Sequence, residues 1–122
     1  MQGGYLGSLL ALLCSKGFRV FLTSDHGNVE AVGVGKPLEG AAAKSRGERV
    51  RVFEKEVLRE GVHCYFPQAI PWPVVGLPPD YFPLLAAARE AFVGKGERIV
   101  SHGGLAIEEV IVPYIEIDRG ME

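Results

Sequence analysis

Val20-Phe-Leu-Thr-Ser-Asp25-His26-Gly27 is an apolar run that ends abruptly on a carboxylate, an imidazole and a glycine. A buried parallel strand has this continuous apolar pattern, and ligands of open α/β sheets bind at the carboxyl ends of such strands. Adjacent Asp and His side chains offer an oxygen and a nitrogen ligand to a divalent cation, and Gly27 lets the backbone turn without a Cβ. We therefore expect a metal site at the end of this strand, with Asp25 and His26 among its ligands.

A helix is predicted before this strand. Apolar residues recur at helical spacing over residues 4–15 and cover more than one face, as in a helix that packs on a sheet. Gly17 suits the left-handed residue that ends a helix. The order of helix, glycine turn and strand over residues 18–23 is the second half of a β-α-β unit, whose first strand would precede Met1. The chain is thus expected to begin in the middle of a fold.

The middle of the chain predicts a loop, two strands and a second helix. Residues 33–47 are rich in glycine and alanine without a sustained period, which predicts an extended loop over the site. Residues 49–53 alternate between polar and apolar, which predicts a half-buried strand that is followed by a second short strand at 62–66. Prolines exclude regular structure over most of 67–83, and the shared apolar face of 84–93 predicts a helix.

A second His-Gly step lies near the end of the chain, in His102-Gly-Gly-Leu-Ala-Ile-Glu108-Glu109-Val-Ile-Val-Pro113. The pattern predicts a strand that ends at His102, then a Gly-Gly turn, one short helical turn over residues 105–109 and a final strand over 110–117. Pro113 places that final strand at an edge or a bulge. If the sheet forms as expected, the ends of two strands bring His102 close to the Asp-His pair.

Length and composition limit the class of protein to which the chain can belong. Residues 1–122 suit a single domain with its own core, which is small for a complete α/β hydrolase. A net charge of −2 with mixed signs gives no polyanion-binding surface, so a nucleic-acid partner is unsupported without being excluded. Cys14 and Cys64 favour two reduced thiols over a disulfide. The lack of a secretion signal or a bilayer-spanning apolar run favours a soluble, cytoplasmic protein with no membrane partner.

The two motifs together resemble the metal-binding half of the alkaline phosphatase superfamily. Ser24-Asp25-His26-Gly27 and His102-Gly103-Gly104 carry this resemblance. The fuller ending through Glu108, Glu109 and Pro113 is similar to the C-terminal signature of the PglZ domain, a branch associated with bacterial phage defence. The start of the first motif also resembles cofactor-independent phosphoglycerate mutases, but the Gly-Gly-x-x-x-Glu-Glu ending favours PglZ. The implied fold is part of an alkaline-phosphatase-like α/β/α sandwich, with a mostly parallel sheet and an edge strand or hairpin.

The resemblance implies a phosphoesterase centre with two divalent metals, zinc first and manganese or magnesium as alternatives, which activate a Ser or Thr nucleophile. It assigns Asp25 and His26 to one metal and His102 to the other. It names no catalytic residue in this chain, because neither Thr23 nor Ser24 matches the nucleophile position of the family. The nucleophile and the remaining ligands would precede the first helix. The chain thus resembles the C-terminal half of a phosphatase or phosphodiesterase domain, inactive on phosphate esters until an N-terminal half completes it.

Plainer interpretations stay open for the charged residues. Asp25 and His26 also fit a capped turn at the end of a strand, and His102 fits a polar turn. The two acidic residues that follow the Gly-Gly step are expected to be helix charges or a partner of an imidazole rather than ligands, and His63 to be a packed strand residue. A solvated strand face explains four basic residues better than a phosphate-binding rim does; they are Lys44, Arg46, Arg49 and Arg51.

Two further functions stay open for the chain as a whole. One is a non-catalytic binding module that keeps the fold without the chemistry, and the other is a remnant with no activity of its own. In every case the expected unpaired strand at residues 18–23 and the apolar, proline-rich segment around Trp72 would expose apolar surface. We therefore expect the chain to form homo-oligomers or to bind a partner protein.

Overall fold

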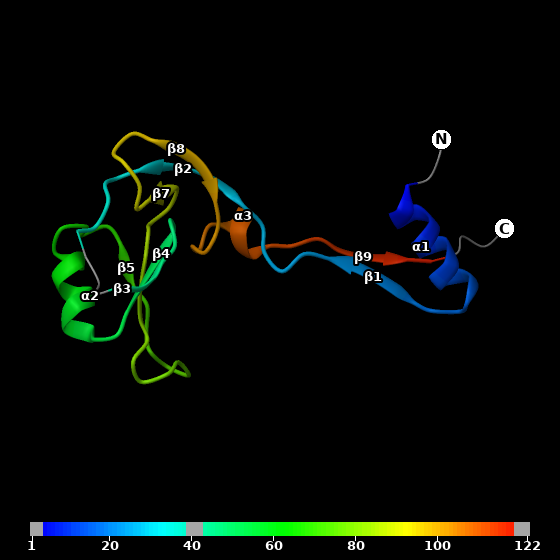
Figure 1. The fold of residues 1–122 in the computed structure, drawn as a ribbon, viewed down its shortest axis with the longest axis horizontal. Helices are drawn as coiled ribbons and strands as arrows, with labels where there is room; N and C mark the ends of the chain where they lie inside the picture. The colour runs from blue at the N-terminus through cyan, green and yellow to red at the C-terminus, as the bar shows by residue number, and fades with distance from the viewer. Residues whose placement is uncertain (1–3, 39–42, 119–122) are drawn as a thin grey trace. The chain divides into compact units, whose positions relative to one another are not determined.

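The computed structural model of the chain describes residues 4–38 and 43–118. It is a mixed α/β structure with small sheets, whose contacts form two compact units (Figure 1). Unit 1 comprises Met1–Asp25 and Val112–Glu122, and unit 2 comprises His26–Ile111. The single domain expected from the length stays a prediction. No helix in the described ranges combines the length and the apolar character that a membrane span requires.

Unit 1 consists of a helix and a two-stranded antiparallel sheet. Helix α1 (Tyr5–Ser15) ends before Gly17, whose φ of 82° is the expected left-handed conformation. Strand β1 (Val20–Thr23) pairs antiparallel with β9 (Tyr114–Ile117). The predicted helix and both predicted strands are therefore confirmed, and both strands are shorter than expected.

The expectation that the first strand is parallel and buried is wrong. β1 runs antiparallel to β9, and its side chains Phe21 and Leu22 are exposed. The direction of pairing depends on which strand the chain brings alongside, and an apolar composition does not encode it. The strand beside β1 is β9, whose apolar side chains Tyr114 and Ile115 are exposed as well.

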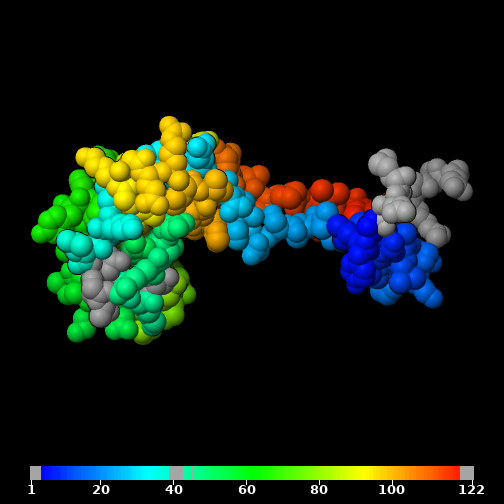
Figure 2. Space-filling view, turned by 45° about the horizontal axis from the view of Figure 1, so that its top comes forward, coloured from blue at the N-terminus to red at the C-terminus, as the bar shows by residue number. Residues whose placement is uncertain are grey.

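One sheet of unit 2 has three strands in the order β7-β2-β8. Its central strand β2 (Val29–Gly33) is antiparallel to β8 (Arg98–Ser101) and parallel to the two-residue strand β7 (Glu90–Ala91). Helix α3 (Ile107–Val110) follows β8 after the Gly-Gly turn, as predicted. In Figure 2 the segment that leads through β8, in yellow, lies at the surface beside residues of β2 in cyan. Buried residues of this sheet and of the segment after β7 form a small core: Val29, Ala31, Ala91 and Val93.

The second sheet of unit 2 has four antiparallel strands in the order β3-β4-β6-β5. Helix α2 (Glu56–His63) packs against β4 and β6. The core of this part consists of Phe53, Ala69, Leu84, Ala86 and Phe92. The strands are β3 (Ala43–Arg46), β4 (Val50–Phe53), β5 (Ile70–Pro71) and β6 (Phe82–Leu85).

The expected mostly parallel sheet is also wrong. Among the strands of residues 4–38 and 43–118, parallel pairing occurs only between β2 and β7. Parallel neighbours need a crossover connection of a dozen or more residues, whereas a short connection joins antiparallel strands. Only residues 47–49 join β3 to β4, and this connection is too short for a crossover, so the two strands are antiparallel.

The helix expected at residues 84–93 is replaced by β6, a turn and β7. Ala88 in that turn has a φ of 40°, which no α-helix accommodates. The amide N–H of Ala86 donates to the carbonyl of Arg49 (2.8 Å), and that of Phe92 donates to the carbonyl of Glu48 (2.7 Å). Leucine and alanine favour a helix locally, but burial against β4 overrides this preference and holds the backbone extended.

Two neighbouring predictions also fail. The strand expected at residues 62–66 is instead the end of α2 and the turn that follows, so His63 is a helical residue with its Nδ1 3.6 Å from Glu60 Oε2. The loop expected over 33–47 contains β3, and its residues 39–42 lie outside the described ranges. Between residues 67 and 83 the structure is irregular apart from the short β5 and the start of β6, largely as expected. Cys14 and Cys64 are free thiols, as predicted.

Candidate metal centre

His26 and His102 stack face to face in unit 2. Their ring centroids lie 3.6 Å apart, and the ring planes meet at 12°. His26 comes shortly before β2 and His102 directly after β8, and these strands are antiparallel with Val29 opposite Ser101. The pairing therefore brings both imidazoles to one end of the β2–β8 pair. The sequence predicted that the two histidines would lie close together, each at the carboxyl end of a strand. In the structure, His26 instead lies at the start of one strand and His102 at the end of its antiparallel neighbour.

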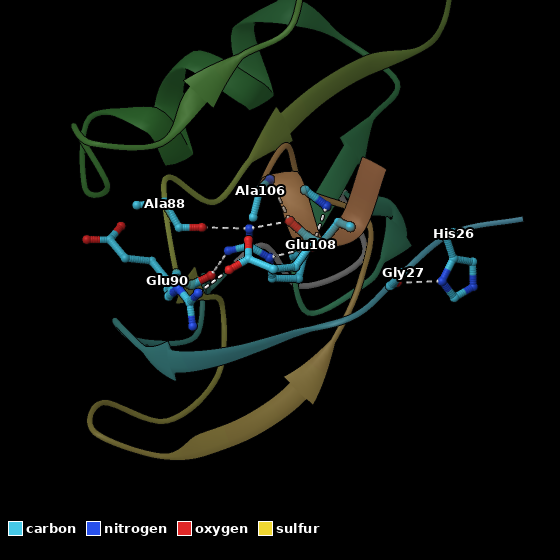
Figure 3. Close-up of polar contacts among 10 residues, drawn as sticks. His26, Gly27, Ala88, Glu90, Ala106 and Glu108 are labelled. Atoms are coloured by element: carbon cyan, nitrogen blue, oxygen red, sulfur yellow. Dashed lines mark hydrogen bonds and ion pairs between the residues drawn. The ribbon is translucent and has the colours of Figure 1, made fainter. Parts of the chain in front are cut away.

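The carbonyl of Gly27 orients the imidazole of His26. Nδ1 of His26 lies 2.7 Å from Gly27 O, the contact drawn as a dashed line in Figure 3. In a neutral imidazole the nitrogen that faces a carbonyl carries the proton, so Nε2 keeps the lone pair. Metal-binding histidines usually donate their other ring N–H to such an acceptor. This geometry suits His26 as a ligand through Nε2.

The described donors form only part of a metal site. Asp25, the third predicted ligand, is exposed and belongs to unit 1. Over residues 4–38 and 43–118, no group of three or more His, Cys, Asp or Glu side chains is placed to hold a metal ion. The lone pairs of an imidazole lie in the ring plane, and stacked planes keep those of His26 and His102 from converging on one ion. The two rings fit a pair of neighbouring ions better than a single ion.

A buried ion pair joins Arg49 to Glu109 of helix α3. Arg49 is fully buried and Glu109 nearly so, with Nε and Nη2 of Arg49 2.9 and 2.7 Å from Oε1 and Oε2 of Glu109. The guanidinium also donates to the carbonyl of Ala88 (2.7 Å) and to that of Glu90. Figure 3 shows Ala88 and Glu90 around this cluster, beside α3. A two-pronged contact of this kind fixes both side chains in one geometry.

Glu109 also binds the backbone on both sides of the site. Its carboxylate accepts hydrogen bonds from the N–H groups of Gly104 (3.0 Å) and Ala106 (2.8 Å). The second bond caps the N-terminus of α3. Its own carbonyl accepts from the N–H of Gly27 (2.8 Å). One residue therefore touches the loop of His26 through its main chain and the loop of His102 through its side chain.

Glycine is required in both motifs because other parts of the chain lie very close to the backbone there. A Cβ at Gly27 would lie 1.9 Å from the carbonyl oxygen of Glu108, and a Cβ at Gly104 would lie 2.4 Å from Nη2 of Arg49. Gly103 has a φ of 104°, a conformation that side chains other than glycine rarely adopt. The His-Gly and His-Gly-Gly steps thus let α3 and Arg49 approach the backbone beside each histidine.

The solvated strand face expected for Arg49 and Arg51 is wrong. Both are buried, Arg49 against Glu109 and Arg51 with Nη2 3.1 Å from the carbonyl of Phe92. Polar and apolar residues alternate here, but β3 and β6 pair with the two edges of β4, helix α2 packs against it, and the 88–92 segment bonds to Arg49 and Glu48 just before its start. The sequence signal for Glu109 was its place in the Gly-Gly-x-x-x-Glu-Glu ending, whereas no local signal distinguishes Arg49.

The environment of Glu109 predicts a pH dependence of stability. Burial favours the neutral acid, but hydrogen bonds from Arg49, Gly104 and Ala106 and the charge of Arg49 outweigh it and lower the pKa of Glu109 from 4.5 to about 2. A carboxylate with a lowered pKa stabilises the fold fully above its unfolded pKa, and this contribution is lost as the pH falls through the folded pKa.

Between about pH 5 and pH 2, the free energy of unfolding of the natural chain should therefore fall by about 3 kcal/mol more than that of Glu109→Gln. Urea unfolding at a series of pH values measures this difference. Asp80, whose pKa is lowered by Lys44, titrates in both proteins and cancels. Parallel stability profiles for the two proteins would show that Glu109 is not held as a carboxylate.

The chain matches a family model of an alkaline phosphatase-like domain over residues 4–117. The family is described as the BREX system PglZ alkaline phosphatase-like domain, and the chain belongs to it. The predicted resemblance to PglZ and its link to phage defence are confirmed, while the placement as a C-terminal half stays a prediction. No curated protein and no solved structure gives a significant match.

Proposed function

We propose that this chain supplies His26 and His102 to the divalent-metal centre of a PglZ phosphatase-like domain whose substrate is a phosphate ester. The observation that carries the proposal is the 3.6 Å stack of the two imidazoles, each in a His-Gly motif. Membership of an alkaline phosphatase-like family supports it. Imidazole nitrogen favours zinc, and manganese and magnesium are the alternatives. Asp25 is proposed as an oxygen ligand on the strength of its motif.

In the proposed centre the metal ions and the chain's own residues would have different roles. Metal ions in such a centre polarise the phosphoryl oxygens and activate the attacking oxygen. The chain's own contribution is to hold two imidazoles at a fixed separation, with the carbonyl of Gly27 setting the tautomer of His26. The remaining ligands and the nucleophile would come from outside the described residues.

The proposal predicts that metal affinity depends on two of the three histidines in the sequence. His26→Ala and His102→Ala should each weaken Zn²⁺ binding by more than the ~10–100-fold that residues orienting a ligand contribute. Asp25→Asn should also abolish tight binding. His63→Ala is the matched control, since His63 lies on α2 beside Glu60, and should leave the affinity unchanged.

Isothermal titration of the full chain with Zn²⁺ measures these affinities. Equal effects of all three histidine substitutions would contradict the proposal. A folded natural chain that binds no Zn²⁺ would instead favour the binding module without the chemistry.

We further propose that unit 1 mediates self-association. Helix α1 has no buried residue, and apolar side chains of α1, β1 and β9 are exposed. Figure 2 shows α1, in dark blue, at the surface. Contiguous apolar surface and unpaired strand edges usually mark an interface. The exposed residues are Tyr5, Leu6, Leu12, Phe21, Leu22, Tyr114 and Ile115.

Sedimentation velocity at micromolar concentration should therefore show a dimer or larger species. Leu6→Glu should shift it to monomer, because Leu6 is 55% exposed and a buried interface does not accept its charge. Val57→Glu is the control, since Val57 is also the second residue of a helix and is 70% exposed, but in unit 2. A monomeric natural chain, or dissociation by both substitutions alike, would contradict this assignment.

A further inference from the structure

We infer that Glu109, held by Arg49, is the positioning residue that sets the separation of His26 and His102. The purpose of this separation rests on the proposed metal centre. The geometry itself belongs to the metal-free chain, where it is open to measurement without any ligand.

Glu109 is hydrogen-bonded to the backbone beside both histidines. Its carbonyl accepts from Gly27, the residue after His26, and its carboxylate accepts from Gly104, two residues after His102. The register of β2 and β8 fixes the strands from which the two loops leave, but both histidines lie beyond the last paired residues. Past the paired residues, Glu109 bonds to both the His26 loop and the His102 loop and so links them.

Arg49 holds the carboxylate of Glu109 in a single position. A glutamate side chain has considerable rotamer freedom, which an exposed residue would keep. Here the guanidinium donates hydrogen bonds to both carboxylate oxygens. It also donates to the carbonyls of Ala88 and Glu90, which fix its own position. Because the side chains of Arg49 and Glu109 are 0% and 2% exposed, water offers neither charge an alternative partner.

A neutral side chain of the same size does not replace the contacts of the Glu109 carboxylate. Glu109 accepts from four donors: two on Arg49 and the N–H groups of Gly104 and Ala106. Glutamine has one acceptor oxygen and an NH₂ group that would face donors. Glu109→Gln should thus release the Gly103–Gly104 turn and move His102 away from His26.

The test is the ring-current shift between the stacked imidazoles in the metal-free full chain. Each ring shields the protons of the other, so the Cε1 and Cδ2 protons of His26 and His102 should resonate upfield of those of His63. In Glu109→Gln both sets should move to the positions of an unstacked histidine. Arg59→Met is the control, because Arg59 is also a buried arginine in ion pairs, with Glu56 and Glu60, but it lies on α2 rather than in either histidine loop.

Each outcome decides the inference. Loss of the upfield shifts in Glu109→Gln with their retention in Arg59→Met supports it, and retention in Glu109→Gln overturns it. Equal loss in the two variants would mean that the stack follows general stability, which also overturns it. Should Glu109→Gln fail to fold, Arg49→Lys replaces it, since lysine keeps the charge but lacks the two-pronged contact.

The Zn²⁺ affinity of the same proteins separates this inference from the proposed function. Loss of the stack in a protein whose natural form binds no Zn²⁺ would leave Glu109 as the positioning residue and remove the metal centre. If Glu109→Gln still binds Zn²⁺ and keeps the stack, the metal centre would stand and Glu109 would not be the positioning residue.

Discussion

Arg49→Met is expected to lower the free energy of unfolding of unit 2 by about 3–5 kcal/mol, the usual cost of removing one partner of a buried ion pair. The substitution leaves the carboxylate of Glu109 buried without its cation, and two backbone carbonyls lose their donor. A loss of this size is a large fraction of the stability of a small domain. Urea unfolding followed by the fluorescence of Trp72, the single tryptophan of the chain, measures it within unit 2.

Arg98→Met is the matched control for this prediction. Arg98 faces Glu30 across the β2–β8 pair in the same unit at 3.5 Å, but the two side chains are 76% and 60% exposed. Exposed ion pairs contribute about 0–1 kcal/mol because water and salt screen them. Equal losses for Arg49→Met and Arg98→Met would show that the burial of the Arg49–Glu109 pair has no energetic consequence.

Gly27→Ala should destabilise unit 2 by about 1–3 kcal/mol, as overpacking of a filled site usually does. The added Cβ would lie 1.9 Å from the carbonyl oxygen of Glu108, so the loop of His26 or helix α3 must move. That movement breaks the hydrogen bond from Gly27 to the carbonyl of Glu109. The measurement is urea unfolding together with the ring-proton shifts of His26 and His102.

Gly61→Ala controls for the gain of a methyl group. Gly61 lies within helix α2, and nothing stands within 4 Å of its added Cβ. Alanine is favoured over glycine in a helix by about 0.5–1 kcal/mol, so this substitution should stabilise the chain. The two Gly→Ala changes are expected to have opposite signs. A stabilising Gly27→Ala would contradict the close approach of α3 to the His26 loop.

Local patterns in the sequence predicted the elements that need little tertiary context. The apolar period of α1, the glycine that ends it and the turn after β8 were all readable from neighbouring residues. The segment of residues 84–93 was not, because its leucines and alanines favour a helix until pairing with β4 holds them extended. Strand direction was not readable either, since β1 has the same composition whether its partner runs parallel or antiparallel.

In the candidate site, too, some residues could be predicted from local sequence patterns and others could not. His26 and His102 were identified because each stands in a short glycine motif, and the antiparallel register of β2 and β8 brings them together. Arg49 was missed because an arginine that alternates with valines predicts an exposed strand face. Its burial depends on Glu109, which lies 60 residues away in the chain. A single sequence carries no signal for a pairing at that distance.

The most direct test of the metal centre is a titration of the histidine-labelled full chain with Zn²⁺, followed through the imidazole ¹H–¹³C signals. The three histidines are all that the sequence contains, so each reports on its own site. We predict that the signals of His26 and His102 shift together and saturate at the same Zn²⁺ concentration, while that of His63 stays in place. Shifts of His63 at that concentration, or unchanged signals of His26 and His102, would contradict the account.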